Sequence, residues 1–200
     1  DVTVVWLGDY VDRGAEPYET LDLVNDGLGI PKLTEVRLMG NHEELMLQAI
    51  NNHAESPELF NLWMMNGGRE TILGICGPHA PREGAALASA LREGLGERLM
   101  LMLNRLSLVH REGNYLFVHG GVDPRVPLDR QDPETLIWIR EPFLTGKGWR
   151  HDFVVVHGHT PAKPVIMPHR IGIDSGCYMT GRLTAVEIRE DQARFIQARP

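Results

Sequence analysis

A buried strand and the polar loop that follows it are encoded by the stretch VTVVWLGDYVDRG, residues 2–14. The first six residues are apolar or β-branched, which is typical of a strand that is covered on both faces. Gly8 ends this run, and two aspartates and an arginine follow before Gly14. A buried strand that ends in a charged, glycine-flanked loop predicts an α/β protein with its chemistry at strand ends.

The same order of apolar strand and polar loop recurs three times along the chain. The further strands are expected at residues 35–39, 114–118 and 153–156, and the loops after them read GNHE (40–43), HGG (119–121) and HGHT (157–160). Helices are predicted over residues 16–26, 43–52, 57–73 with a break at 66–68, and 78–106, and a last strand over 183–188. Leucines and a methionine recur at helical spacing in the 78–106 segment and predict a buried stripe of residues 87, 91, 95, 99 and 102.

Composition excludes several classes of protein. The 200 residues are 42% hydrophobic and 24% charged, which is ordinary for a soluble protein, and we expect one domain over residues 1–200. The formal net charge of −7 argues against a broad nucleic-acid interface, and no apolar run reaches the roughly 20 residues of a membrane helix. Two cysteines and no signal peptide at the start predict a cytoplasmic protein without a disulfide framework.

The four polar loops together offer oxygen and imidazole donors. One such cluster alone is weak evidence, because aspartates and histidines are common at turns and strand ends. Their joint occurrence favours a site for zinc, iron or manganese. Two divalent ions roughly 3.5–4 Å apart need one shared carboxylate, and Asp9 is placed to supply it. The candidate donors are Asp9, Asp12, Asn41, His42, His119, His157 and His159.

The order of these motifs resembles that of the calcineurin-like metallophosphoesterases, in particular the phosphoprotein phosphatase branch. The matching motifs are GDYVDRG (8–14), GNHE (40–43), HGG (119–121) and GHTP (158–161). Within that branch the chain is most similar to the bacterial and phage lambda type of serine/threonine phosphatase, through LWMMNGG (62–68), IWIR (137–140), GHTPA (158–162) and IDSG (173–176). The resemblance implies an α+β sandwich of two mixed β-sheets flanked by helices.

The resemblance also implies a role for individual residues. Asp9 would bridge two metals, while Asn41, His119 and His159 would complete the second metal site. Mn²⁺ is the expected ion, and Zn²⁺, iron or Ni²⁺ are alternatives. The residues implied in catalysis are His42 as the general acid, Asp12 as the group that orients it, and Arg13 and Arg140, which with Asn41 would bind the substrate phosphate.

The sequence leaves the roles of Glu43 and His157 open. Glu43 is interpreted as a helix-start residue or as a residue that supports the site, because acidic side chains favour the first turn of a helix. In the family pattern the ligand is the histidine directly after glycine, so we select His159. His157 is then either a supporting residue or a purely structural one.

The first motif of the family, Gly-Asp-x-His-Gly after a strand, has no counterpart here, so we expect the first strand and helix of the fold to be missing. Either the recorded chain has lost its N-terminal residues, which is the interpretation we favour, or it is a variant with one metal. As written, the first metal site has only Asp9. We therefore expect one well-formed metal site and weak or absent activity of this exact chain unless another segment fills the gap.

Three functions follow from the resemblance and from the missing motif. The leading hypothesis is a metal-dependent phosphomonoester hydrolase that uses a metal-activated water on protein phosphoserine or phosphothreonine, and also phosphotyrosine. A symmetrical dinucleoside tetraphosphate hydrolase is the second, and a catalytically weak module that binds phosphorylated partners is the third. The expected partner is a phosphorylated protein or a small phosphoester, with no nucleic acid and no membrane. The sequence leaves the oligomeric state open.

Overall fold

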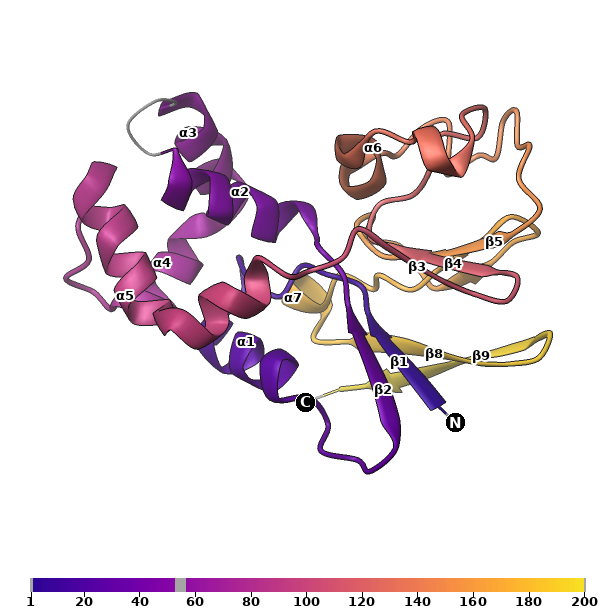
Figure 1. Ribbon diagram of the computed structural model, residues 1–200, viewed down its shortest axis with the longest axis horizontal. Helices are drawn as coiled ribbons and strands as arrows, with labels where there is room; N and C mark the ends of the chain where they lie inside the picture. Colours follow the sequence, from indigo (N-terminus) through magenta and orange to yellow (C-terminus); the bar gives the residue numbers. More distant parts are fainter. Residues whose placement is uncertain (1, 53–56, 200) are drawn as a thin grey trace. The chain divides into compact units, whose positions relative to one another are not determined.

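The computed structural model describes residues 2–52 and 57–199, which form two compact units (Figure 1). Unit 1 is Asp1–Ser107 and unit 2 is Leu108–Pro200. Each unit has its own sheets and helices, and each is described by itself. The single domain over residues 1–200 stays a prediction.

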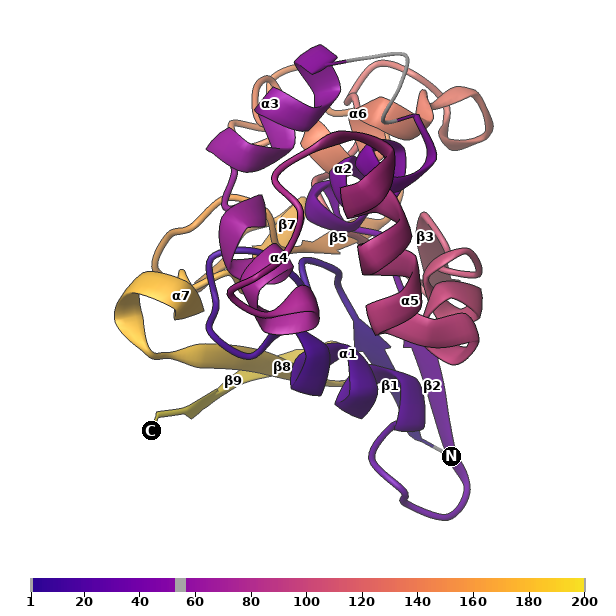
Figure 2. The same ribbon diagram turned by 90° about the vertical axis from the view of Figure 1, so that its left-hand side faces the viewer.

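Unit 1 pairs a short parallel sheet with a group of helices. Strands β1 and β2 lie side by side with Val2 opposite Leu33 and Trp6 opposite Arg37 (Figures 1 and 2). Helix α2 packs against α3 and α5, and α1 packs against α4 and α5. The elements described in this unit are β1 Val2–Trp6, α1 Pro17–Asp26, β2 Leu33–Arg37, α2 Asn41–Asn51, α3 Pro57–Met65, α4 Gly68–Cys76 and α5 Gly84–Leu103.

The helix predicted over residues 78–106 is shorter than expected. It begins only at Gly84, because Pro78 and Pro81 lack the backbone N–H that a helix needs and restrict the residues before them. Gly96, with φ 68° and ψ 170°, also breaks the regular helix of α5. The buried stripe is confirmed, since all five of its side chains are at most 9% exposed: Leu87, Leu91, Leu95, Leu99 and Met102.

Unit 2 is built on a mixed five-stranded sheet in the order β3-β4-β5-β7-β6. The central pairs β4–β5 and β5–β7 are parallel, whereas β3–β4 and β6–β7 are antiparallel. An antiparallel pair, β8–β9, forms a second sheet. The elements described here are β3 Val109–Glu112, β4 Tyr115–Val118, a 3₁₀ turn Leu128–Arg130, α6 Pro133–Trp138, β5 Val154–His157, β6 Val165–Ile166, β7 Arg170–Gly172, α7 Cys177–Thr180, β8 Leu183–Arg189 and β9 Gln192–Ala198.

The α/β class with mixed pairing and flanking helices is confirmed, although several strands were not predicted. Strands β6 and β7 are two and three residues long, too short for a periodic pattern. Strands β3 and β9 are rich in polar side chains and are exposed along much of their length. Among the described residues, no helix is both long and apolar enough to cross a bilayer.

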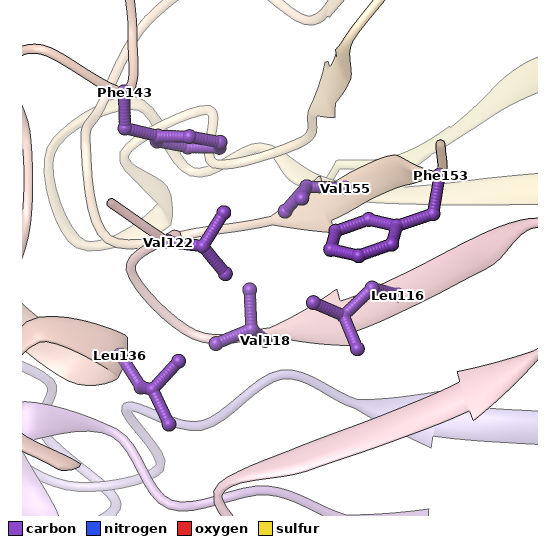
Figure 3. Close-up of a cluster of buried hydrophobic side chains, with 7 residues drawn as sticks. All are labelled: Leu116, Val118, Val122, Leu136, Phe143, Phe153 and Val155. Carbon is purple, nitrogen blue, oxygen red and sulfur yellow. The ribbon is translucent and has the colours of Figure 1, made fainter. Parts of the chain in front are cut away.

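A cluster of apolar side chains fixes the strand ends of unit 2. Leu116 and Val118 from β4 and Val155 from β5 cluster with Val122 from the loop after β4 and Phe143 from the turn after α6 (Figure 3). All five side chains are fully buried. Because β4 and β5 are parallel with Phe117 opposite Val156, the residues that follow them emerge at the same edge of the sheet. This core therefore positions both histidine loops of the unit.

Replacing Leu116 with alanine is expected to lower the free energy of unfolding by about 2–5 kcal/mol, because the side chain is fully buried and its loss leaves a cavity. Chemical denaturation measures the change. Leu183→Ala on β8 is the matched control, since that leucine is 62% exposed. Equal effects of the two substitutions would contradict the assignment of Leu116 to the core.

Candidate functional site

The polar loop after β1 has a backbone that ordinary side chains rarely adopt. Asp9, Asp12 and Arg13 have φ values of 61°, 73° and 61°. Non-glycine residues in this left-handed region cost energy, and they persist where neighbouring groups hold them in place. His159, in unit 2, has φ 61° and belongs to the same class. Four of the residues selected from sequence motifs are therefore held in unusual conformations.

Glu43, in the first turn of α2, is the group that holds this loop. Its side chain is fully buried, and one carboxylate oxygen accepts hydrogen bonds from the N–H groups of Asp9 (2.8 Å) and Gly40 (2.9 Å). The other oxygen accepts from the N–H groups of Tyr10 (2.6 Å) and Val11 (3.2 Å). Glu43 therefore begins its helix and also binds the loop, so both of its sequence interpretations apply.

Gly40 lies where these two segments meet, and only glycine fits there. A Cβ atom at this position would lie 2.3 Å from Asp9 Oδ1 and 2.7 Å from Glu43 Oε2. Both contacts are far inside van der Waals distance. The glycine of the GNHE motif is therefore required because the backbone at the start of α2 approaches the loop after β1.

Asp12 and His42 form a buried hydrogen-bonded pair. His42 Nδ1 donates to Asp12 Oδ2 at 2.6 Å, and both residues are at most 8% exposed. Burial lowers the pKa of His42, but the hydrogen bond to Asp12 and the charges of Asp9 and Asp12 outweigh it. The pKa of His42 therefore lies above its usual value, which favours the protonated imidazole that can act as an acid.

Two further side chains hold the Asp12 carboxylate. Trp63 Nε1 donates to both carboxylate oxygens, at 3.0 and 3.1 Å, and Thr71 Oγ1 donates to Oδ1 at 2.6 Å. Neither residue was selected from the sequence. A buried tryptophan needs an acceptor for its N–H, which is a signal for Trp63, but a threonine within a helix carries no such signal.

Asp9 lies beside the N-terminus of α2. Its Oδ1 accepts a hydrogen bond of 3.4 Å from the His42 N–H, and its Oδ2 is 3.9 Å from His42 Nε2. Asn41, the first residue of α2, is buried. The positive end of a helix favours a carboxylate in this position. Unit 1 therefore places Asp9, Asp12, Asn41 and His42 together, as the sequence motifs suggested.

Arg13 lies at the exposed end of the same loop. Its Nε donates to the carbonyl oxygen of Asn66 at 3.1 Å, and its backbone N–H donates to that of Gly67 at 3.2 Å. The turn between α3 and α4 thus anchors the arginine through its backbone and the base of its guanidinium. The exposed guanidinium suits an anion that arrives from solvent.

In unit 2, His119 follows β4 and His159 follows β5 by two residues. Both are buried, and their rings meet edge to face with centroids 5.2 Å apart. One ring nitrogen of each lies within 4.8 Å of the other. Two imidazoles that bind one tetrahedral ion have nitrogens about 3.4 Å apart. The two imidazoles are therefore close enough together to be candidate ligands of one metal ion.

His157 has a different environment. Its Nδ1 donates to the carbonyl oxygen of Gly158 at 3.0 Å, and its Nε2 accepts from Arg170 Nη1 at 3.2 Å. Burial and the adjacent guanidinium lower the pKa of His157 to about 3, so the ring is neutral. Because both ring nitrogens are engaged, His157 supports the fold beside His159, in agreement with the sequence interpretation that it is not a ligand. Arg170, its partner, was not anticipated.

Arg140 follows α6 and is exposed. Its carbonyl oxygen accepts from the Leu144 N–H at 2.8 Å, which closes a turn. Within the described ranges its guanidinium makes no hydrogen bond or ion pair, so it is free to bind an external anion. Unit 2 thus places His119 beside His159, and it holds Arg140 in a separate turn.

Comparisons with known proteins agree on one family. Residues 1–193 match the family model of the calcineurin-like phosphoesterases. The asymmetrical bis(5'-nucleosyl)-tetraphosphatase PrpE of Oceanobacillus iheyensis is 24% identical over 213 residues, which cover 98% of this chain and 78% of that protein.

Two solved structures show the same fold. A protein provisionally named a diadenosine tetraphosphatase has a TM-score of 0.62 and 21% identity, and the match covers 98% of this chain and 80% of that one. The cold-active protein-tyrosine phosphatase of a psychrophilic Shewanella species has a TM-score of 0.53 and 14% identity, with coverage of 98% and 66%. At these identities the structural matches establish the fold alone.

Glu43→Gln is expected to lower the free energy of unfolding by at least about 2 kcal/mol, because one amide oxygen cannot serve four buried N–H donors. Thermal and chemical denaturation measure the loss. Glu19→Gln, in the first turn of α1 and exposed, is the matched control and should change little. A Glu43→Gln variant as stable as the parent chain would refute the role of Glu43 in holding the loop.

Proposed function

This chain belongs to the calcineurin-like phosphoesterase family, and from that membership we propose that it hydrolyses phosphomonoesters, with protein phosphoserine, phosphothreonine or phosphotyrosine as the substrate class. As a metallophosphoesterase it is a hydrolase that uses divalent metal ions. The finer assignment is supported by one feature of unit 1 above all, the buried hydrogen bond between Asp12 and His42.

The leaving group of the reaction explains why this pair matters. An alkoxide or phenoxide leaves phosphorus far more easily once it is protonated, and positioned acids contribute about 10²–10⁴-fold to such steps. The raised pKa of His42 favours the protonated imidazole, and Asp12 fixes Nδ1 so that Nε2 faces away from the Asp12 carboxylate. His42 is therefore proposed as the general acid and Asp12 as the residue that orients it.

The metal ligands are proposed from the donor chemistry of the two units. The proposed ligands are Asp9, Asn41, His119 and His159, the residues that the resemblance of the motifs implies. Buried imidazoles with carboxylate and amide oxygens suit Mn²⁺, Zn²⁺ or iron, and Mn²⁺ remains the expected ion. When bound, the metal activates a water and neutralises phosphoryl charge.

Phosphate binding is proposed for Arg13 and Arg140, with the Asn41 amide as a further donor. Planar guanidinium groups can bind two phosphate oxygens at once, and both arginines present their charge to solvent. Arg13 is the better anchored, through Asn66 and Gly67. A phosphoryl group held in this way does not rely on a broadly basic surface, in accordance with the net charge of −7.

A dinucleoside tetraphosphate is the second candidate substrate, and the name of a relative supports it. The PrpE protein that is 24% identical to this chain is an asymmetrical bis(5'-nucleosyl)-tetraphosphatase. Such a reaction releases a nucleotide phosphate, whose pKa of about 6 makes it a good leaving group without help from an acid. The Asp12–His42 pair therefore favours the phosphomonoester, and the relative favours the tetraphosphate.

A polypeptide of these 200 residues is expected to bind about one Mn²⁺ ion tightly. His119→Ala and His159→Ala should each weaken the affinity by roughly 10-fold or more, because each removes a proposed ligand. Isothermal titration calorimetry and elemental analysis measure affinity and stoichiometry. His110→Ala on β3 is the control. Two tightly bound ions per chain, or unchanged affinity in both variants, would contradict the proposed site.

His42→Ala is expected to slow the hydrolysis of phosphoserine by about 10²-fold or more, and that of p-nitrophenyl phosphate much less, because only the first leaving group needs the acid. Assays with added Mn²⁺ compare both substrates with a phosphopeptide and a dinucleoside tetraphosphate. His79→Ala, an exposed histidine of the same unit, is the control.

The pattern of substrates then decides between the candidates. Turnover of the tetraphosphate alone would overturn the phosphomonoester proposal in favour of the second candidate. Binding of phosphopeptides with no turnover of any substrate would identify a phospho-binding module instead.

A further inference from the structure

The Asp12 carboxylate is held more firmly than its bond to His42 requires. Its two oxygens accept hydrogen bonds from His42, from Trp63 at 3.0 and 3.1 Å, and from Thr71 at 2.6 Å. The Asp12 side chain is fully buried. A carboxylate with a single partner can rotate about its side-chain bonds, whereas three donors from different directions fix its plane.

Thr71 holds the main chain of Asp12 as well as its side chain. The threonine hydroxyl accepts a hydrogen bond of 2.8 Å from the Asp12 N–H and donates its proton to Oδ1. One hydroxyl thus satisfies both the backbone N–H and a carboxylate oxygen of Asp12, a residue whose φ is 73°. Because Thr71 is fully buried, no water can replace it without a rearrangement.

The turn between α3 and α4 is shaped around the Trp63 ring. The indole is fully buried, and a Cβ atom on Gly68, the first residue of α4, would lie 2.6 Å from its Cε2 atom. Glycine therefore lets α4 begin directly against the ring. Thr71 lies one helical turn further along α4, and its hydroxyl donates to Asp12 Oδ1.

We propose that Trp63 and Thr71 are positioning residues. They fix Asp12, and Asp12 in turn fixes the imidazole of His42, which protonates the leaving group. Neither side chain contacts the substrate. Their effect is to keep the carboxylate plane aligned with His42 Nδ1, so that Nε2 stays aimed at one place. The inference rests on the proposed function, because it assigns these residues to the acid of that reaction.

Thr71→Val and Thr71→Ser separate the hydroxyl from the shape of the side chain. Valine keeps the volume and removes the hydroxyl, and it should lower kcat for phosphoserine by about 10-fold while changing KM little. The loss with p-nitrophenyl phosphate should be smaller, since its leaving group needs no acid. Serine keeps the hydroxyl and should restore most of the rate. An equal loss with both substrates would indicate a structural role only and overturn the inference.

A double-mutant cycle tests whether the effect passes through Asp12. In an Asp12→Ala background, Thr71→Val should slow phosphoserine hydrolysis no further, because the group that it positions is gone. Additive losses would contradict the proposal. If the valine variant does not fold by circular dichroism, Trp63→Phe provides the same test, since it removes the N–H donor and keeps an aromatic ring.

A spectroscopic readout separates this inference from the proposed function. The proton that His42 Nδ1 shares with Asp12 should give a downfield signal in the ¹H NMR spectrum of the parent protein, and the signal should weaken or shift in Thr71→Val and Trp63→Phe. Turnover of a dinucleoside tetraphosphate but of no phosphomonoester by the parent chain refutes the proposed function, whatever the spectrum shows. An unchanged signal in both variants refutes the positioning role, whatever the activity.

Discussion

The buried carboxylate of Glu43 is the interaction on which unit 1 depends. Four backbone N–H groups from the loop after β1 and from the start of α2 converge on its two oxygens. Those bonds offset the cost of a loop with Asp9 at positive φ. Burial and then the Glu43 charge raise the pKa of Tyr10 above its usual range, so that side chain stays neutral beside the carboxylate. The Glu43 carboxylate thus holds the loop that carries Asp9 and Asp12, to which the proposed chemistry is assigned.

A second buried carboxylate, Asp12, differs from Glu43 because its main partners are side chains. Trp63 and Thr71 hold it, and it orients His42. Trp63 and Thr71 donate hydrogen bonds that stabilise its charge, and its Oδ2 accepts a hydrogen bond from His42 Nδ1. In unit 2 the roles of two nearby histidines differ in the same way: metal binding is proposed for His159, whereas burial and the Arg170 guanidinium lower the pKa of His157 and keep its ring neutral. The two histidines, His157 and His159, therefore have different proposed roles.

Much of the fold could be predicted because hydrophobic periodicity and glycine-flanked loops are local signals. They predicted strands at residues 2–7, 114–118 and 153–156, which the structure has within a residue at each end, and the buried stripe of α5. The start of α5 was predicted too early, because Pro78 and Pro81 delay the helix until Gly84. Strands β6 and β7 could not be predicted, since two or three residues become a strand only through their pairing partners.

The sequence by itself determined the family, because that depends on motif order and residue type, and the same motifs carry the proposal of the polar donors and of His159 rather than His157 as a ligand. Only the tertiary structure decided what surrounds them. Trp63 and Thr71 lie 51 and 59 residues from Asp12, and Glu43 reaches a loop more than 30 residues away. Such contacts arise when helices pack against a strand end, and no local pattern in the chain records which buried donor meets which buried carboxylate.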